Sequence, residues 1–219
     1  MTKPHRTHLS EAQEDYLKQI HLLAEGGMVT TQALAGRMGV RPASVTGMLK
    51  KLASLGLVDY APYRGVRLTE AGRAVALEVL RHHRLIETYL AEALGYDWDE
   101  VHAEAERLEH HISEAFEARI AEWLGHPERD PHGDPIPTPD LTLPPHGATL
   151  AAAGAGDYRL LRVRSQDKGT LALLARLGLV PGTHFELVEN GPAGARIELA
   201  GERFLLPAEL ARALEVEAL

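Results

Sequence analysis

The sequence predicts a mainly α-helical chain with small β parts: an N-terminal winged helix-turn-helix, a middle group of long helices and a C-terminal β-barrel. Three observations predict this arrangement. Two short helical patterns precede two short alternating runs, long helical patterns then extend to about residue 124, and short strands follow residue 158. The 219 residues are 45% hydrophobic and 25% charged, a balance typical of a folded protein.

The N-terminal helices show the spacing of a helix-turn-helix. Residues 9–24 and Thr31 to Met38 each carry apolar positions at helical spacing, and Gly39 ends the second run. A further helix begins at Pro42, where the missing N–H costs nothing, and extends to Gly56. Two short helices joined by a tight glycine turn are the helix-turn-helix arrangement.

A β-hairpin is predicted directly after this second short helix. Residues 57–60 and 66–69 have strand character, and the turn residues 62–65 separate them. A hairpin in this position is a wing.

This winged helix supplies candidate DNA contacts. A recognition helix places its N-terminal residues at base edges and its flanks on phosphates. The candidates are Arg41, Pro42, Ser44 and Thr46 at the helix start, Lys50 and Lys51 further along, and Arg64 at the wing tip. The alternative is a winged helix used for protein contacts, with solvated lysines.

The charge of the chain is unevenly distributed. The net charge is −8, yet the first 75 residues carry ten Lys and Arg against six Asp and Glu, whereas the remainder carries thirteen against twenty-five. A basic third on an acidic body is typical of a chain that meets nucleic acid with one end only.

Composition excludes several classes of function. The chain has no cysteine, which excludes disulfides, thiolate zinc sites and thiol catalysis. It shows no apolar run of the signal-peptide kind and no stretch of 18 apolar residues. We therefore expect a cytoplasmic protein without a membrane partner.

Three helices, a linker and a small barrel are predicted after the wing. Thr69 caps a helix that extends to about Leu94, and two more are predicted over residues 97–111 and 113–124. The proline-rich segment 126–147 is predicted to be a linker fixed against the surface. The later elements are strands over 158–164, 185–189, 196–199 and 204–206, a helix over 169–177, and hairpin signals at Asn190-Gly191 and Ala200-Gly201.

The first two of these helices carry histidines and carboxylates at helical spacing. His83 and Glu87 are four residues apart and share one helix face. The next helix continues the pattern with His102, Glu106, Glu109 and His110. On neighbouring helices these side chains would point at each other, and buried charge of this kind needs pairing or a cation.

Each of these features also has a simpler interpretation. Most single helical histidines are satisfied surface or core residues, and His82 and His111, off the shared face, are interpreted in this way. A Glu–His pair four apart is often only a surface contact. Two pairs on consecutive helices favour a metal site, and imidazole with carboxylate, without sulfur, suits manganese, ferrous iron, cobalt or zinc.

The order of the motifs resembles the diphtheria toxin repressor family of metal-dependent regulators, in its manganese-responsive branch. The resemblance rests on the winged helix followed by HHRLIE, VHAEAERLEHH and HPERDPHGDPIP, and it extends over nearly the whole chain. It implies a winged-helix domain over residues 1–72, a helical metal-binding and dimerisation domain over 73–145, and an SH3-like domain of the FeoA type over 146–219.

The resemblance also implies two metal sites. The main site takes one ligand from the first helix and four from the middle helices: Asp15, His83, Glu106, Glu109 and His110. The ancillary site takes His83 or a close neighbour, Glu87 and His102, with a barrel ligand near Gln166-Asp167. The iron-responsive branch carries sulfur-bearing residues where this chain has Asp15 and Glu106, which agrees with manganese.

Two positions depart from the family's pattern. In the two-domain manganese sensors a further acidic ligand follows one turn after the aspartate, and here that position is Lys18. A main and an ancillary site, with one or two ions per subunit, are therefore expected in place of a binuclear site. Asp130 stands where many relatives carry cysteine, a change expected to be neutral for function.

These features predict a non-enzymatic, manganese- or ferrous-iron-dependent transcriptional regulator, a repressor of metal-uptake genes or an activator of efflux. It would bind a palindromic double-stranded operator as a homodimer, and cobalt or zinc could replace the ion in vitro. Two other classes stay open. A carboxylate-bridged dimetal enzyme would use Glu-x-x-His on paired helices, and a regulator of an organic ligand would use the His–Glu faces only as a polar interface.

Overall fold

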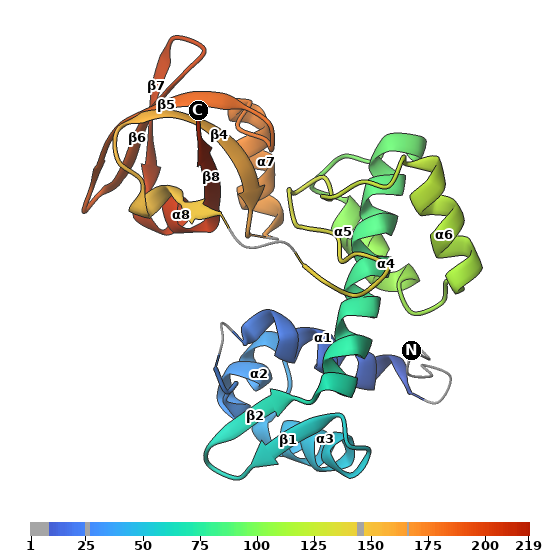
Figure 1. Cartoon of the computed structure of the whole chain (residues 1–219). Helices are drawn as coiled ribbons and strands as arrows, with labels where there is room; N and C mark the ends of the chain where they lie inside the picture. The colour runs from blue at the N-terminus through green and yellow to red at the C-terminus, as the bar shows by residue number, and fades with distance from the viewer. Residues whose placement is uncertain (1–8, 25–26, 144–146, 166) are drawn as a thin grey trace. The chain divides into compact units, whose positions relative to one another are not determined.

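The computed structural model describes residues 9–24, 27–143, 147–165 and 167–219 (Figure 1). It divides into two compact units, which are described separately. The first comprises Met1–His83, Glu109–Ile112 and Pro137–Thr142, and the second comprises Arg84–Leu108, Ser113–Ile136 and Leu143–Leu219. The boundary between His83 and Arg84 falls inside one helix, α4 (Glu70–Leu94).

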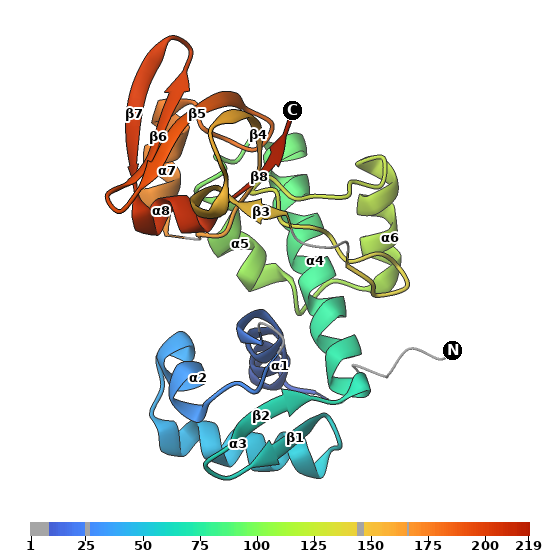
Figure 2. The same ribbon diagram turned by 60° about the vertical axis from the view of Figure 1, so that its left-hand side comes forward.

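The first unit is a winged helix-turn-helix, as predicted. Its elements are α1 (Glu11–Leu23), α2 (Thr31–Met38), α3 (Pro42–Ser54), the antiparallel strands β1 (Val58–Ala61) and β2 (Gly65–Leu68), and the start of α4. The Thr30 side chain accepts a hydrogen bond from the N–H of Ala33 at the start of α2, and Gly39 ends that helix with φ 64°. Figures 1 and 2 show the hairpin beside α3.

The core of this unit is built from apolar residues of all its helices and of the wing. The fully buried side chains are Leu17, Ile20, Leu34, Val45, Leu49, Leu52, Val66, Ala76 and Val79. Val29, just before α2, forms a β-bridge with Val66 of the wing. This core and the bridge pack the wing against the helices of the unit.

Before its β-domain, the second unit contains the rest of α4, α5 (Val101–Leu108) and α6 (Glu114–Trp123). Of these, α5 differs at both ends from the helix predicted over residues 97–111. The helix predicted to reach residue 111 ends at Leu108, and the next three residues form a turn. Helical spacing therefore does not relate Glu109 and His110 to the residues before them.

The proline-rich segment is not the surface linker that the sequence predicted. His132 is 0% exposed and Ile136 is 4% exposed. Asp130 accepts hydrogen bonds from the backbone N–H groups of His132 and Asp134, and Arg84 donates to the carbonyl of Pro135 at 2.5 Å. Because side chains satisfy its backbone, this segment can lie inside the protein without regular secondary structure.

The C-terminal part of the second unit is a small β-domain whose strands curve around a core (Figures 1 and 2). The strands are β3 (Ala148–Thr149), β4 (Gly156–Val163), β5 (His184–Gly191), β6 (Gly194–Leu199), β7 (Glu202–Pro207) and β8 (Leu214–Ala218). They form one sheet in the order β3-β8-β4-β5-β6-β7. The remaining elements are the 3-10 turn η2 (Leu150–Ala152), α7 (Lys168–Leu177) and α8 (Ala208–Ala213).

The two hairpin signals had different outcomes. Ala200 and Gly201 form the two-residue turn between β6 and β7, with φ 52° and 81°, as their residue types predict. Asn190 and Gly191 instead belong to β5, and the turn falls at the two residues that follow them. In the part of the chain that the structure describes, no helix has the length and apolar character needed to cross a membrane.

Candidate metal and nucleic-acid sites

The recognition helix α3 and the wing line a groove of about 510 Å³ in the first unit. It brings together four of the predicted DNA contacts: Pro42, Thr46, Lys50 and Arg64. The hydroxyl of Thr46 donates to the carbonyl of Pro42 at 3.1 Å. The other three candidates, Arg41, Ser44 and Lys51, are exposed on α3 or at its start but do not line the groove.

Tyr63 is a groove residue that sequence reasoning missed. It lies at the wing tip, is 107% exposed, and has a left-handed φ of 66°. A fully exposed aromatic side chain next to Arg64 is available for contact with a ribose or a base. Its position in the turn Pro62-Tyr63-Arg64-Gly65 was the signal that could have identified it.

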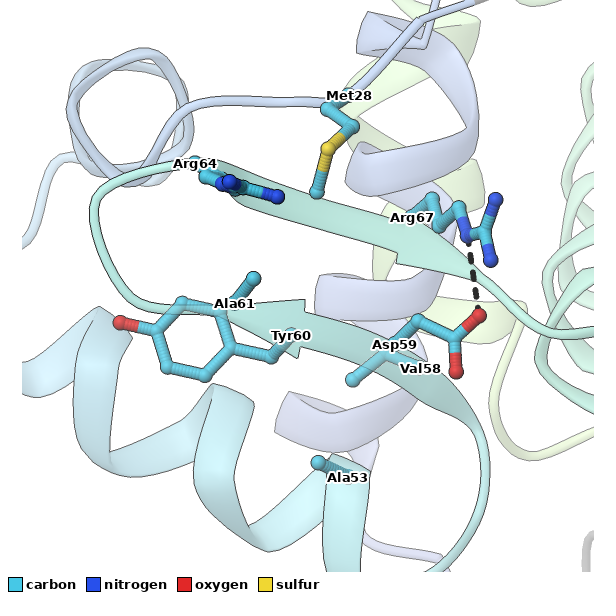
Figure 3. A pocket seen from close by; sticks show the side chains of 8 residues that line it. All are labelled: Met28, Ala53, Val58, Asp59, Tyr60, Ala61, Arg64 and Arg67. Carbon is cyan, nitrogen blue, oxygen red and sulfur yellow. Dashed lines mark hydrogen bonds and ion pairs between the residues drawn. The ribbon is translucent and has the colours of Figure 1, made fainter.

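The two arginines of the wing, Arg64 just before β2 and Arg67 within it, have different surroundings. Figure 3 shows them in a second pocket of the wing, where Arg67 Nε lies 3.0 Å from Asp59 Oδ2 and the side chain of Met28 lies over the strand. Arg67 is therefore partly neutralised. Among the described residues no carboxylate pairs with Arg64, whose charge is available to phosphate.

A candidate metal site of the first unit lies where α1 meets the turn after α5. One ligand atom each from Asp15, Glu109 and His110 lies within 4.8 Å of the others. His110 Nε2 lies 3.1 Å from Asp15 Oδ1 and 3.3 Å from Glu109 Oε1. The fold thus brings together three residues that were predicted as main-site ligands. The most distant of them, Asp15 and His110, are 95 positions apart in the sequence.

Glu109 is the most buried residue of this group, with 0% exposure. One carboxylate oxygen accepts from His83 Nδ1 at 2.5 Å, and the other is bound by the ammonium group of Lys18. Burial raises the pKa of Glu109, but the hydrogen bond and charge of His83 and the charge of Lys18 outweigh burial and lower it. Glu109 is therefore an anion in the metal-free protein.

Lys18 places a fixed positive charge inside the candidate site. It is 3% exposed, and its Nζ lies 4.0 Å from Asp15 Oδ1 as well as in contact with Glu109. In the family that the sequence resembles, the two-domain manganese sensors carry an acidic ligand at this position. The structure adds that the ammonium group contacts the ligands themselves.

Glu14 is a partner of this site that sequence reasoning missed. Its Oε2 lies 2.7 Å from His110 Nδ1, so both ring nitrogens of His110 face carboxylates. Burial lowers the pKa of His110, but the hydrogen bonds with Asp15 and Glu14, together with the charge of Glu109, raise it to about 9. Glu14 stands next to the predicted ligand Asp15 in the sequence. Its contact with His110 becomes evident only once the fold places His110 beside α1.

The other candidates near this site have varied surroundings. His82 is buried, and its Nδ1 donates to the carbonyl of Glu109 at 3.1 Å. The side chain of His111 is 61% exposed and lies 3.6 Å from Glu11. Both match the simple interpretation of satisfied core and surface histidines. Glu106 is not in the group of Asp15, Glu109 and His110, so its role as a main-site ligand stays a prediction.

The ancillary candidates in the second unit centre on Glu87. His102 Nδ1 donates to Glu87 Oε1 at 3.0 Å, and His102 Nε2 lies 3.6 Å from Glu106 Oε1. His83, the remaining candidate, precedes Glu87 by one turn of α4. Asp167 caps α7 by accepting from Thr170, and Gln166 lies outside the described residues, so a ligand from the barrel stays a prediction.

Comparison with known families matches three successive parts of the chain. Residues 8–66 match the iron dependent repressor N-terminal DNA binding domain, residues 69–138 match the iron dependent repressor metal binding and dimerisation domain, and residues 149–218 match the FeoA domain.

Similar proteins extend over almost the full chain. The iron-dependent repressor IdeR of Mycobacterium tuberculosis (strain H37Rv) is 33% identical over 95% of this chain and 98% of its own length. The diphtheria toxin repressor of Corynebacterium efficiens is 32% identical over 95% and 96%.

Solved structures give the same result. A manganese-dependent transcriptional repressor in complex with manganese superposes with a TM-score of 0.86 at 38% identity, covering 94% of this chain and 100% of its own. ScaR with bound Zn²⁺ superposes with a TM-score of 0.83 at 34% identity, over 94% and 99%.

Proposed function

This chain belongs to the iron-dependent repressor family of metal-dependent DNA-binding transcriptional repressors, and from that premise we propose that manganese is its co-effector. The observation that carries the proposal is the group of Asp15, Glu109 and His110. Its donors are carboxylate oxygens and one imidazole, without sulfur, and a set rich in carboxylates suits harder ions such as manganese. The relative that superposes with a TM-score of 0.86 is a complex with manganese.

The position of the ligands suggests how an ion would act on DNA binding. Asp15 is on α1, which packs against α2 and the wing, whereas Glu109 and His110 lie in the turn after α5. A bound divalent cation would join these two segments and neutralise the carboxylates, which otherwise repel phosphate. We propose that this joining fixes the recognition helix in its DNA-competent orientation.

The partner of this regulator is proposed to be a palindromic operator bound by a homodimer. Two recognition helices of a dimer meet half-sites about 34–36 Å apart on one face of DNA. The matched dimerisation domain over residues 69–138 supports the dimer, and the groove lined by Lys50 and Arg64 supports the DNA contact. Linkage then requires DNA to tighten metal binding by the same factor that metal tightens DNA binding.

A gel-shift titration on the DNA upstream of the protein's own gene tests the proposal. The affinity measured with manganese should exceed the affinity measured with chelator by about tenfold or more, equivalent to about 1.4 kcal/mol. Asp15→Asn should abolish that difference. Glu11→Gln is the matched control, because Glu11 is an exposed carboxylate on the same helix that is not part of the group. Equal affinities with manganese and with chelator for the unaltered protein would contradict the proposal.

A further inference from the structure

We propose that Met28 is a site of reversible oxidation by hydroperoxides, and that its oxidation weakens DNA binding through the wing. Of the three methionines that the structure describes, Met28 is 45% exposed, whereas Met38 and Met48 are partly buried against the core of the first unit. The chain has no cysteine, so a thioether is the sulfur group available to an oxidant. Susceptibility to oxidation follows exposure, and Met28 is therefore the first target.

The backbone around Met28 is attached to the wing. Val29, the next residue, donates to the carbonyl of Val66 at 2.8 Å and accepts from the N–H of Val66 at 2.9 Å. A Cβ on Gly65 would lie 2.6 Å from the carbonyl oxygen of Val29 and 3.5 Å from the Cβ of Met28. The side chain of Met28 therefore starts from a fixed position against the turn of the wing.

The thioether of Met28 shares a pocket with two guanidinium groups. The pocket has a volume of about 480 Å³, and Met28, Arg64 and Arg67 are among its lining residues. Figure 3 shows the Met28 side chain over β2, with Arg64 on one side and Arg67 on the other. Asp59 already holds Arg67 at 3.0 Å, so Arg64 is the arginine that a new acceptor in this pocket would attract.

Oxidation would create such an acceptor. The thioether sulfur gives up two electrons and forms a bond to one oxygen of a hydroperoxide. The O–O bond breaks, and the hydroperoxide proton moves to the other oxygen, which leaves as water or an alcohol. The thioether is a weak acceptor of hydrogen bonds, whereas the product sulfoxide is polar. Methionine sulfoxide reductases reverse the reaction, so the modification can act as a switch.

Arg64 is the residue through which oxidation would reach DNA binding. It lines both the pocket that contains Met28 and the groove between the wing and α3. A guanidinium group that donates to the sulfoxide oxygen is withdrawn from a phosphate in the groove. Each phosphate contact that is lost lowers the affinity for DNA and makes it less dependent on salt.

Oxidation of the full chain with hydrogen peroxide tests the proposal. Chelator during oxidation prevents metal-catalysed damage to histidines, and catalase then removes the peroxide. Peptide mass spectrometry should find one added oxygen on Met28 before Met38 or Met48. The oxidised protein should bind its upstream DNA more weakly, with a slope of log affinity against log salt that is shallower by about 1. Methionine sulfoxide reductase should restore both.

The loss should be measured with and without manganese. Because a phosphate contact of Arg64 does not require the metal site, oxidation should weaken binding in both conditions. A failure of manganese as the co-effector would therefore leave this test intact, and the two failures are distinguishable.

Matched variants connect the loss to Met28 and Arg64. Met28→Leu conserves the volume of the side chain, so it should keep the affinity for DNA and lose the response to peroxide. Met38→Leu is the control, because it changes a partly buried methionine and should keep the response. Met28→Gln places an amide at this position and should weaken binding without peroxide.

The Arg64→Ala variant makes the outcome decisive. Its binding should not weaken further when Met28 is oxidised, because the arginine that the sulfoxide attracts is absent. Earlier oxidation of Met38 or Met48, a full response in Met28→Leu, or an equal further loss in oxidised Arg64→Ala would overturn the proposal.

Discussion

Glu109 is bound on both carboxylate oxygens, by His83 on one side and by Lys18 on the other. All three residues are at most 5% exposed. For these buried residues the stability of the fold depends on oppositely charged partners, because a buried charge without a counter-charge is strongly unfavourable. Single residues of this site therefore affect both the stability of the fold and metal binding.

The metal-free protein should lose stability when Glu109 is neutralised. Glu109→Gln removes the buried carboxylate that both Lys18 and His83 contact, and breaking such a buried pair costs about 3–5 kcal/mol in the free energy of unfolding. Glu104→Gln, which removes an exposed pair with Arg107, should cost less than about 0.5 kcal/mol. Urea denaturation of both variants in chelator measures the difference, and equal values would contradict a buried ion pair.

Metal binding and stability should depend on pH in opposite directions. The pKa of His110 is raised from 6.5 to about 9, so its contribution to the stability of the metal-free protein is full below pH 6.5 and is lost as the pH rises through 9. A metal ligand must release that proton, so manganese affinity should increase by up to about tenfold per pH unit between pH 7 and 9. Calorimetry in two buffers of different ionisation enthalpy measures the released proton; no release would exclude His110 as a ligand.

The ligands of the main site were predictable from the sequence only where a residue stands in a recognisable motif. Glu109 and His110 could be assigned because they belong to a motif of polar residues where a helix interface would be apolar, whereas Asp15 was assigned from the family resemblance alone. The contact of Glu14 with His110 could not be predicted, because the two residues lie 96 positions apart in the chain. Helical spacing was misleading for Glu109, which lies beyond the end of α5.

At the scale of elements, the proline-rich segment is held by close contact between backbones. Gly133 has φ +81°, and a Cβ there would lie 1.9 Å from the carbonyl oxygen of Leu161 in β4. The backbone N–H of Val163 in turn donates to the carbonyl of His132 at 2.8 Å. The segment is thus attached to the β-domain by its main chain.

Gly133→Ala should therefore be strongly destabilising. The left-handed backbone and the clash with Leu161 together should cost about 3 kcal/mol or more. Gly95→Ala is the matched control, since Gly95 has φ +71° but open space around it, and strain alone costs about 1 kcal/mol. Thermal unfolding of the two variants measures the loss of stability in each. An equal loss would show that β4 shifts to make room for the new Cβ and would contradict the expected clash.

Elements with strong local signals were predictable, and short ones were not. Thr30, Gly39 and Pro42 mark helix ends by their own chemistry, so the winged helix followed from the sequence. Strands β3 and β8 and helix α8 were missed, because β3 has two residues and α8 passes directly into β8 without a turn signal. The pairing of β8 with β3 and with β4 is a tertiary contact that no local pattern encodes.

At the scale of the whole molecule, the charge distribution predicts how DNA binding responds to salt. The first 75 residues carry the positive excess, and the remainder is acidic. Affinity should therefore come from few phosphate contacts near the groove of α3 and the wing, each releasing a counterion.

Arg64→Ala should weaken DNA binding with and without metal. The slope of log affinity against log salt should become shallower by about 1, as expected for the loss of one phosphate contact. Arg67→Ala, which makes the same change in charge in the same wing but removes a side chain paired with Asp59, should change the slope less. Fluorescence anisotropy over a salt series measures both, and identical slopes for the two variants would exclude a phosphate contact at the wing tip.

Lys18 changes what the measured metal affinity of the main site represents. With its ammonium group already on Glu109, metal uptake under the proposed function is an exchange of one cation for another, as on an ion-exchange resin. The measured affinity is then the difference between two binding energies, so weak apparent affinity is compatible with strong ligands. Such a sensor can shift the metal concentration at which it responds by altering the displaced cation, with every ligand left unchanged.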